Sequence, residues 1–263
     1  MSEAAHCYLQ LLKKCVGNFI YEDDLDLLAG RMACSAETGQ ISVLESDPAP
    51  PNPEDRYMGR IWPSRAHTMI GLPRLDNLQQ CIEQVLADDV PGDLIETGVW
   101  RGGATIFMRG VLKAHGVTDR IVWVADSFAG LPPNDFGAYP KESKIPFHHF
   151  HELAVPLEEV RRNFSRYDLL DEQVRFLAGW FRDTLPAAPI ERLAVLRLDG
   201  DLYESTSDAL VHLYPKLSPG GFVIVDDYDI VLSSNDAVHD FRRAQGISTP
   251  VQGIVGGGAF WRR

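Results

Sequence analysis

Residues 193–201, LAVLRLDGD, and residues 220–229, GGFVIVDDYD, are two apolar runs that end in aspartates. We expect each run to form a buried strand and the two strands to be neighbours in a parallel sheet. The carboxyl ends of parallel strands meet at one edge, so Asp199 would lie beside Asp226 and Asp227. Crowded carboxylates repel one another unless a cation, a proton or another partner offsets their charge. These oxygen ligands suit Mg²⁺ and predict a metal site, although a solvated acidic rim that includes Asp201 and Asp229 is the alternative.

The chain from residue 74 onward alternates helical and strand patterns. Besides the runs that become strands at 193–199 and 221–227, strands are expected at 93–97, 121–126 and 174–179, and residues 256–263, GGGAFWRR, are expected to form a terminal edge strand. Expected helices cover 74–88, 104–115, 157–167, 204–217 and 235–245. Strands that alternate with helices predict an α/β fold with a mostly parallel sheet and helices on both faces.

The N-terminal part has a different pattern. Residues 8–20 repeat apolar side chains at helical spacing, whereas residues 38–64 contain five prolines among polar residues and predict a long segment without regular structure. We therefore expect an N-terminal helix and lid or cap in residues 1–72, followed by a core domain in 73–263 with an insertion loop at about 132–156.

Composition limits the classes of partner. The 263 residues carry a formal net charge of −12, with a sequence pI of about 5.1, so nothing favours binding to nucleic acid or to an anionic membrane. The N-terminal sequence does not resemble a secretion signal, and no apolar run approaches the length of a membrane span. The four cysteines lack metal-type spacing and are expected to be reduced thiols. A cytoplasmic location is the expectation.

A glycine-containing turn follows the first core strand. Glu96, Thr97, Gly98, Val99 and Trp100 lead into the helix at 104–115, without the G-x-G-x-x-G spacing of a dinucleotide site. An acid at the start of this turn suits the α-ammonium group of a methionine moiety better than a phosphate. The pattern therefore favours S-adenosylmethionine over NAD.

Two further strand ends suit the rest of this cofactor. The second core strand ends in Asp126, with Ser127 after it, where nucleotide-binding α/β folds place a carboxylate for the ribose hydroxyls. Gly179 and Trp180 lie at the end of the third, where an amide and a flat ring could meet adenine. Core packing is the competing explanation for this Trp.

The reaction expected here removes a proton from an alcohol. A free carboxylate, with a pKa near 3.9, is too weak a base for a hydroxyl whose pKa resembles that of water, about 15.7. Metal binding would lower the hydroxyl pKa, and Asp199 could then accept the proton as the oxygen attacks the methyl carbon. His67, His148, His149 and His151 could form a zinc site, but their spacing favours substrate contact, a helper base or plain surface use.

Several sequence blocks resemble the macrocin O-methyltransferase family, the sugar O-methyltransferases of macrolide and aminocoumarin biosynthesis. The blocks occupy residues 65–78, 91–104, 122–132, 169–189, 193–203 and 217–228. RIWPSRAH and DGDLYEST are similar to the aminocoumarin, noviose-type enzymes. The resemblance implies the Rossmann-like class I methyltransferase fold with a seven-stranded sheet, and a homodimer or higher homo-oligomer.

The resemblance also implies an activity: Mg²⁺-dependent transfer of a methyl group from S-adenosylmethionine to a deoxysugar hydroxyl of a glycosylated natural product. It assigns Asp199, Asp226 and Asp227 to the metal and Asp199 to proton removal. The residues that it implies for the cofactor are Thr68, Met69, Glu96, Thr97, Gly98, Val99, Trp100, Asp126, Ser127, Gly179 and Trp180. Tyr57, Met58, His148 and His149 are expected to contact the substrate.

Two other functions remain possible from the residues. Asp199-Gly200-Asp201 could be the metal-binding D-x-D of a nucleotide-sugar glycosyltransferase, although that assignment leaves Glu96-Thr97-Gly98 unexplained. The chain could also bind S-adenosylmethionine without catalysis, with the carboxylates as a solvated rim.

Overall fold

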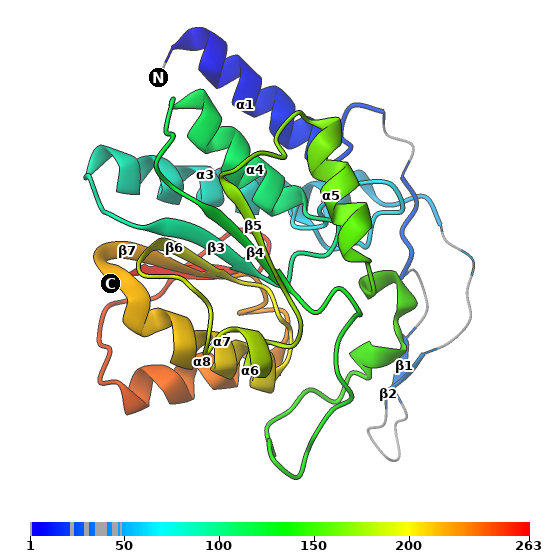
Figure 1. Cartoon of the computed structure of the whole chain (residues 1–263). Coiled ribbons are helices and arrows are strands. Elements are labelled where there is room, and N and C mark those ends of the chain that lie inside the picture. The colour runs from blue at the N-terminus through cyan, green and yellow to red at the C-terminus, as the bar shows by residue number, and fades with distance from the viewer. Residues whose placement is uncertain (1, 22–23, 29–31, 35–40, 44–46, 48) are drawn as a thin grey trace.

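A seven-stranded mixed sheet forms the centre of the molecule in a computed structural model that describes residues 2–21, 24–28, 32–34, 41–43, 47 and 49–263 (Figure 1). The strand order is β5-β4-β3-β6-β7-β9-β8. The five strands from β5 to β7 run parallel, β9 pairs antiparallel with β7, and β8 pairs antiparallel with β9. The strands are β3 (Asp93–Thr97), β4 (Val122–Asp126), β5 (Val174–Ala178), β6 (Leu193–Leu198), β7 (Leu217–Val225), β8 (Gln252–Gly253) and β9 (Ala259–Arg262).

Helices cover both faces of this sheet, as the alternating pattern predicts (Figure 1). On one face lie α1 (Glu3–Val16), α3 (Gly71–Ala87), α4 (Gly103–Ala114) and α5 (Leu157–Arg166). On the other lie α6 (Phe181–Thr184), α7 (Tyr203–Leu213) and α8 (Leu232–Ala244). Because successive strand residues point to opposite faces, Leu94 and Val124 join the first hydrophobic cluster, whereas Ile95 and Ala125 join the second. Each face of the sheet therefore has its own core.

The N-terminal helix packs on the core. Leu9, Leu12 and Val16 of α1 are buried, and contacts join α1 to α4 and α3. A side chain at Gly110 of α4 would overlap Leu12, so this glycine permits the close approach of the two helices. The division at residue 72 into a cap and a core stays a prediction.

The proline-rich stretch differs from the sequence expectation. Residues 38–64 are not all irregular, because they contain α2 (Pro53–Met58) and β2 (Ile41–Val43), which pairs with β1 (Met32–Cys34). The signals for α2 are local: Asn52 caps the Glu54 amide, Pro53 occupies the first turn, and Gly59 ends the helix in the left-handed region. Residues 38–40, 44–46 and 48, which the expectation also covered, lie outside the described residues.

Other boundaries also need correction. The strand expected at 256–263 is β9, which lies between β7 and β8 and is not an edge strand. Its backbone pairs on both sides because the chain first forms β8 and then turns back through Gly256 and Gly257. Cys7, Cys15 and Cys81 are free thiols, as expected, while the side chain of Cys34 lies outside the described part of the chain. Within the described residues, no helix combines the length and apolar character needed to cross a membrane.

The insertion loop at 132–156 carries two short 3₁₀ turns, at Phe147–His149 and His151–Leu153. Phe147 and Phe150 form a third hydrophobic cluster with Leu202 and Val231, which follow β6 and β7. Trp62 from the N-terminal part packs edge-on against Phe150, with ring centroids 5.1 Å apart. The loop and the N-terminal segment thus meet beside the carboxyl ends of the central strands.

Candidate functional site

A cavity of about 630 Å³ opens at the carboxyl edge of the sheet. Its walls come from the ends of β3, β4, β6 and β7, from the insertion loop and from the N-terminal segment. Of the residues predicted for cofactor or metal, those on the wall are Thr68, Met69, Glu96, Gly98, Val99, Trp100, Asp126, Ser127, Trp180, Asp199, Asp226 and Asp227. This is the place where open α/β sheets bind ligands.

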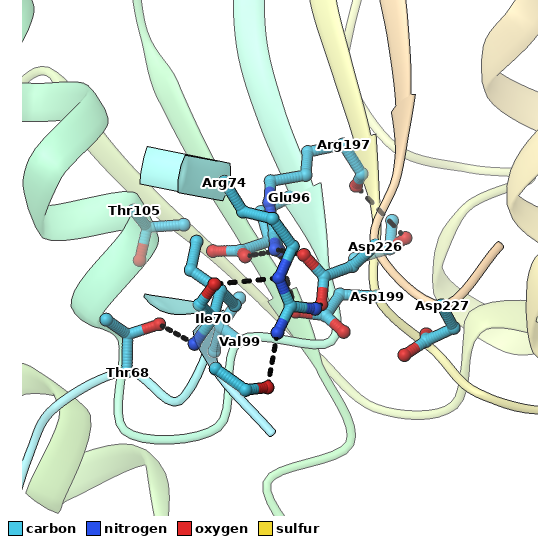
Figure 2. A network of polar contacts seen from close by, with 12 residues as sticks. Thr68, Ile70, Arg74, Glu96, Val99, Thr105, Arg197, Asp199, Asp226 and Asp227 are labelled. Carbon is cyan, nitrogen blue, oxygen red and sulfur yellow. Dashed lines mark hydrogen bonds and ion pairs between the residues drawn. The ribbon is translucent and has the colours of Figure 1, made fainter. Parts of the chain in front are cut away.

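The predicted metal ligands converge. One carboxylate oxygen from each of Asp199, Asp226 and Asp227 lies within 4.8 Å of the others (Figure 2). Asp199 directly follows β6, and Asp226 and Asp227 directly follow β7, so the parallel pairing of these strands accounts for the juxtaposition. Asp226 and Asp227 are buried.

A buried arginine stands at the centre of this carboxylate group. The guanidinium of Arg197, which is 1% exposed, donates to Glu96, to Asp199 at 2.7 Å and to Asp226 (Figure 2). A guanidinium presents five donors in a planar fork, which lets one side chain hold three carboxylates. Sequence reasoning did not assign Arg197 a role, although a charged residue within the apolar run LAVLRLD requires a buried partner and could have indicated one.

A second arginine reaches the same group from α3. Arg74 donates to the second oxygen of Asp226, to the Ile70 carbonyl at 2.7 Å and to the Gly59 carbonyl at 2.7 Å. It therefore ties the N-terminal segment to the end of β7. Arg74 lies 152 residues before Asp226, and no local pattern in the sequence indicates this contact.

The site contains more carboxylates than guanidinium groups to compensate their charge. Glu96, Asp199, Asp201, Asp226 and Asp227 lie around the two guanidiniums, which leaves an excess of three negative charges if all are ionised. Burial, followed by the charge of Asp226, raises the pKa of Asp199 to about 6, although Arg197 opposes this shift. Burial and the neighbouring carboxylates also raise the pKa values of Asp201 and Asp227 well above the usual range. The group repels itself and would be relieved by an added cation.

Glu96 is almost completely buried at the end of β3. Burial raises its pKa to about 8, against the lowering influence of Arg197. Its Oε1 accepts from Arg197, while Oε2 is a buried oxygen without a hydrogen-bond partner among the described residues. Since Glu96 also lines the cavity, it can accept a hydrogen bond from a ligand.

The glycine turn after β3 fits closely against the end of β6. Gly98 has φ +87°, and a side chain there would overlap the Asp199 carbonyl oxygen. Trp100 also has a positive φ, +48°, and its indole donates to the Glu152 carbonyl of the insertion loop at 2.8 Å. A tight backbone of this kind at a cavity wall is typical of a ligand-binding turn.

Asp126 at the end of β4 braces this turn. Its carboxylate accepts from the Val99 amide at 2.7 Å and from the Phe128 amide at 2.8 Å. Burial raises the pKa of Asp126, whereas these amide hydrogen bonds lower it. Asp126 thus positions the glycine turn, in addition to any contact with a ribose.

Some predicted site residues do not reach the cavity. Thr97 is buried in β3, and Gly179 does not line the cavity, whereas its neighbour Trp180 does. Tyr57, Met58, His148 and His149 also do not line it, whereas their neighbours Gly59, Arg60, Phe147 and Phe150 do. In the insertion loop, the aromatic side chains and not the adjacent histidines face the cavity, because Phe147 and Phe150 supply the apolar surface that the third cluster buries. No histidine belongs to the metal-type group found among the described residues.

His67 is held by hydrogen bonds to two parts of the core and does not line the cavity. It shares a hydrogen bond of 2.7 Å with the Tyr167 hydroxyl, and its carbonyl accepts from the Gly103 amide at the start of α4. Burial, followed by the charges of Arg166 and Arg101, lowers the pKa of His67 to about 4. The ring is therefore neutral at physiological pH.

Comparison with known proteins gives one consistent family. Residues 5–263 match the family model described as Macrocin-O-methyltransferase (TylF). The chain is 57% identical, over 99% of its length and 94% of the relative's, to an 8-demethyl-8-(2,3-dimethoxy-alpha-L-rhamnosyl)-tetracenomycin-C 4'-O-methyltransferase of Streptomyces olivaceus. It is 52% identical, over 97% of its length and 93% of the relative's, to a demethyldecarbamoylnovobiocin O-methyltransferase of Streptomyces niveus. The structure of the O-methyltransferase NovP superposes with a TM-score of 0.86 at 51% identity, covering 98% of this chain and 99% of that one.

Proposed function

Because this chain belongs to the macrocin O-methyltransferase family and is therefore an O-methyltransferase, we propose that it methylates a sugar hydroxyl of a glycosylated natural product. The methyl donor in this proposal is S-adenosylmethionine, and the metal is Mg²⁺. A third relative, at 51% identity, is named mycinamicin III 3''-O-methyltransferase, so the relatives act on three different kinds of compound. The rhamnosyl group in the first name supports a deoxysugar as the acceptor.

The observation that carries the proposal is the convergence of Asp199, Asp226 and Asp227 beside the glycine turn, in one cavity. Their chemistry fits Mg²⁺, which prefers carboxylate oxygens and keeps positions for other ligands. Burial and the charges of neighbouring carboxylates raise the pKa values of Asp199 and Asp227, and this repulsion supports a cation between the aspartates. The three aspartates are the residues that would hold the ion.

The same cavity suits a cationic methyl donor. Glu96, with its unpartnered Oε2, is placed to receive an ammonium group, and the excess negative charge around it favours a sulfonium ion. Asp126 and Ser127 lie on the wall where ribose hydroxyls would bind, and Trp180 offers a ring to adenine. The turn from Gly98 to Trp100 connects these positions.

A bound Mg²⁺ would make an alcohol more acidic, and S-adenosylmethionine would supply the methyl group. Asp199 is then the base: Arg197 holds its Oδ2 at 2.7 Å, which orients Oδ1 to accept the hydroxyl proton. Arg74 and Arg197 hold Asp226 in place from both sides. Trp62, Phe147 and Phe150 form an apolar wall of the same cavity, which would limit the access of water to the reacting groups.

Methyl transfer is preferred over the two alternatives. The match of nearly the whole chain to an O-methyltransferase family disfavours a nucleotide-sugar glycosyltransferase that uses Asp199-Gly200-Asp201. Relatives that are named as enzymes also disfavour a non-catalytic binding protein. A homodimer or higher homo-oligomer stays a prediction, for which the exposed apolar side chains of Tyr8 and Leu11 on α1 offer a surface.

Calorimetry and mass spectrometry test the proposal. We expect S-adenosylhomocysteine to bind with micromolar affinity and a uridine diphosphate sugar not to bind. Incubation of demethylated glycosides with labelled S-adenosylmethionine and Mg²⁺ should transfer one methyl group to the sugar. EDTA or Asp199→Ala should abolish transfer but leave S-adenosylhomocysteine binding intact, and the exposed-site control Asp183→Asn should behave as wild type. Turnover in EDTA would remove the metal from the mechanism, and tight binding of the diphosphate sugar would favour the glycosyltransferase.

A further inference from the structure

The insertion loop contains a buried carboxylate that does not line the cavity. Glu142 is 6% exposed. Its Oε1 accepts from the amides of Ser143 at 2.6 Å and Tyr203 at 3.0 Å, and its Oε2 accepts from the amide of Glu204 at 3.1 Å. Three backbone donors thus bind one loop side chain.

Two of these donors are the first amides of α7. The first amides of a helix have no partner within the helix, and α7 begins after Leu202, whose side chain offers no cap. A carboxylate satisfies such donors and interacts favourably with the helix dipole. Glu142 therefore caps α7 from a position 61 residues earlier in the chain than Tyr203.

The capped end of α7 continues directly into the carboxylate group. Asp199, Gly200 and Asp201 precede the helix, and the Asp201 amide donates to Asp227 at 3.1 Å. Asp201 has φ +57°, a conformation that persists only when its surroundings hold it. Any shift of the start of α7 therefore also moves Asp201 and the segment from Asp199, which connects the end of β6 to this helix.

Hydrogen bonds within the insertion loop also fix the position of Glu142. Asn134 donates to the Ser143 carbonyl at 2.7 Å and to the Ile145 carbonyl at 3.3 Å, which closes the loop on itself. Phe147 and Phe150, further along the same loop, pack with Leu202 and form part of the cavity wall. Glu142 therefore connects the loop that carries the aromatic wall to the helix that follows the carboxylate segment.

We propose that Glu142 is a positioning residue that clamps the insertion loop to the start of α7 and so holds the acceptor wall and the metal-binding aspartates in one arrangement. The inference rests on the proposed function, in which the aspartates bind Mg²⁺, and it adds that the aromatic wall beside them contacts the acceptor. Glu142 acts through the amides of Tyr203 and Glu204 and touches neither ligand. Its loss weakens acceptor and metal binding together.

The experiment compares Glu142→Gln and Glu142→Asp with wild type. The glutamine removes the charge and one acceptor, whereas the aspartate keeps the charge but shortens the reach. Asp135→Asn, at an exposed position of the same loop, is the control for loss of one negative charge. Four quantities are measured: hydrogen exchange of residues 200–206, the Mg²⁺ concentration at half-maximal thermal stabilisation, the acceptor KM, and the Kd for S-adenosylhomocysteine.

Both Glu142 variants should raise the acceptor KM and the Mg²⁺ midpoint by about tenfold, the effect expected from losing one hydrogen bond to a charged group. The amides of Tyr203 and Glu204 should exchange faster, while the Kd for S-adenosylhomocysteine stays within about twofold of wild type. The control should match wild type in all four measurements.

Several outcomes would overturn the clamp. In one, Glu142→Asp behaves as wild type, which would mean that charge and not reach matters. In another, all ligands weaken by the same factor, which would mean general loosening. Equal exchange of the Tyr203 and Glu204 amides in wild type and variants would also refute it. If wild type methylates no glycoside, the proposed function fails, but the exchange and Mg²⁺ measurements still decide whether the clamp exists.

Discussion

Replacing Arg197 by Met tests the electrostatic core of the site. Met has similar length but no charge, so the change leaves Glu96, Asp199 and Asp226 without the guanidinium that they share. Removing one partner from a buried ion pair costs about 3–5 kcal/mol, because the remaining charge has no compensation. The three pairs are not additive, since they share one cation and Asp226 keeps Arg74. Glu96 can also limit the cost by staying protonated, because its pKa is already raised to about 8.

We therefore expect Arg197→Met to lower the free energy of unfolding by about 3–5 kcal/mol, or the melting temperature by about 6–15 °C for a chain of this size. Urea and thermal denaturation, followed by circular dichroism in EDTA, measure both quantities. Adding Glu96→Gln to the variant should restore about 1–2 kcal/mol, because glutamine is neutral at every pH and replaces a buried carboxyl group that has lost its guanidinium partner. Arg197→Lys, which keeps the charge but cannot reach all three partners, should fall between Met and wild type.

The result that would refute this reasoning is an Arg197→Met protein within about 1 kcal/mol of wild type, since a surface ion pair contributes no more than that. A strictly additive effect of Glu96→Gln would likewise contradict the coupling between the two side chains. Either result would mean that solvent and not Arg197 compensates the carboxylates.

Other perturbations address the turn, the metal and the pH response. Gly98→Ala should lower the free energy of unfolding by about 3 kcal/mol or more and abolish S-adenosylhomocysteine binding, because the new side chain overlaps the Asp199 carbonyl. Gly116→Ala, at φ +68° in open space, should lower the free energy of unfolding by only about 1 kcal/mol. Denaturation compares the stability of the two variants, and calorimetry compares their cofactor binding. Mg²⁺ at about 100 times its Kd should stabilise the wild type by about 2.7 kcal/mol and should not stabilise Asp199→Ala, and a thermal shift in that variant equal to wild type would contradict the assignment. The folded-state pKa of His67 lies below its unfolded value of 6.5, so its stabilising contribution is complete above pH 6.5 and is lost as the pH falls towards 4. After allowance for the partial exposure of His67, the free energy of unfolding of wild type should fall by about 1 kcal/mol more than that of His67→Gln between pH 7 and pH 5, as measured by urea titrations. If the free energies of unfolding of the two proteins depend on pH in the same way, His67 does not titrate in this range.

Local patterns in the sequence predict most of the fold. The apolar runs and their alternation with helices predict the five parallel strands and the helices on both faces, and the structure confirms them. Asn52, Pro53 and Gly59 mark α2 equally well, but the prolines of the same stretch suggested irregular structure. The position of β9 inside the sheet could not be read from its own residues, because it depends on pairing with the short strand β8 that precedes it.

The sequence by itself determined that Asp199, Asp226 and Asp227 gather at one edge of the sheet, since each follows a strand whose direction its neighbours impose. Only the tertiary structure decided which cations compensate them. Arg74 and Arg197 reach Asp226 across 152 and 29 residues, and the partners of a buried charge are chosen by three-dimensional proximity, which leaves no periodic trace in the chain. For the same reason, the side chains of the insertion loop that face the cavity were settled by packing, which turned Phe147 inward and left the adjacent histidines off the wall.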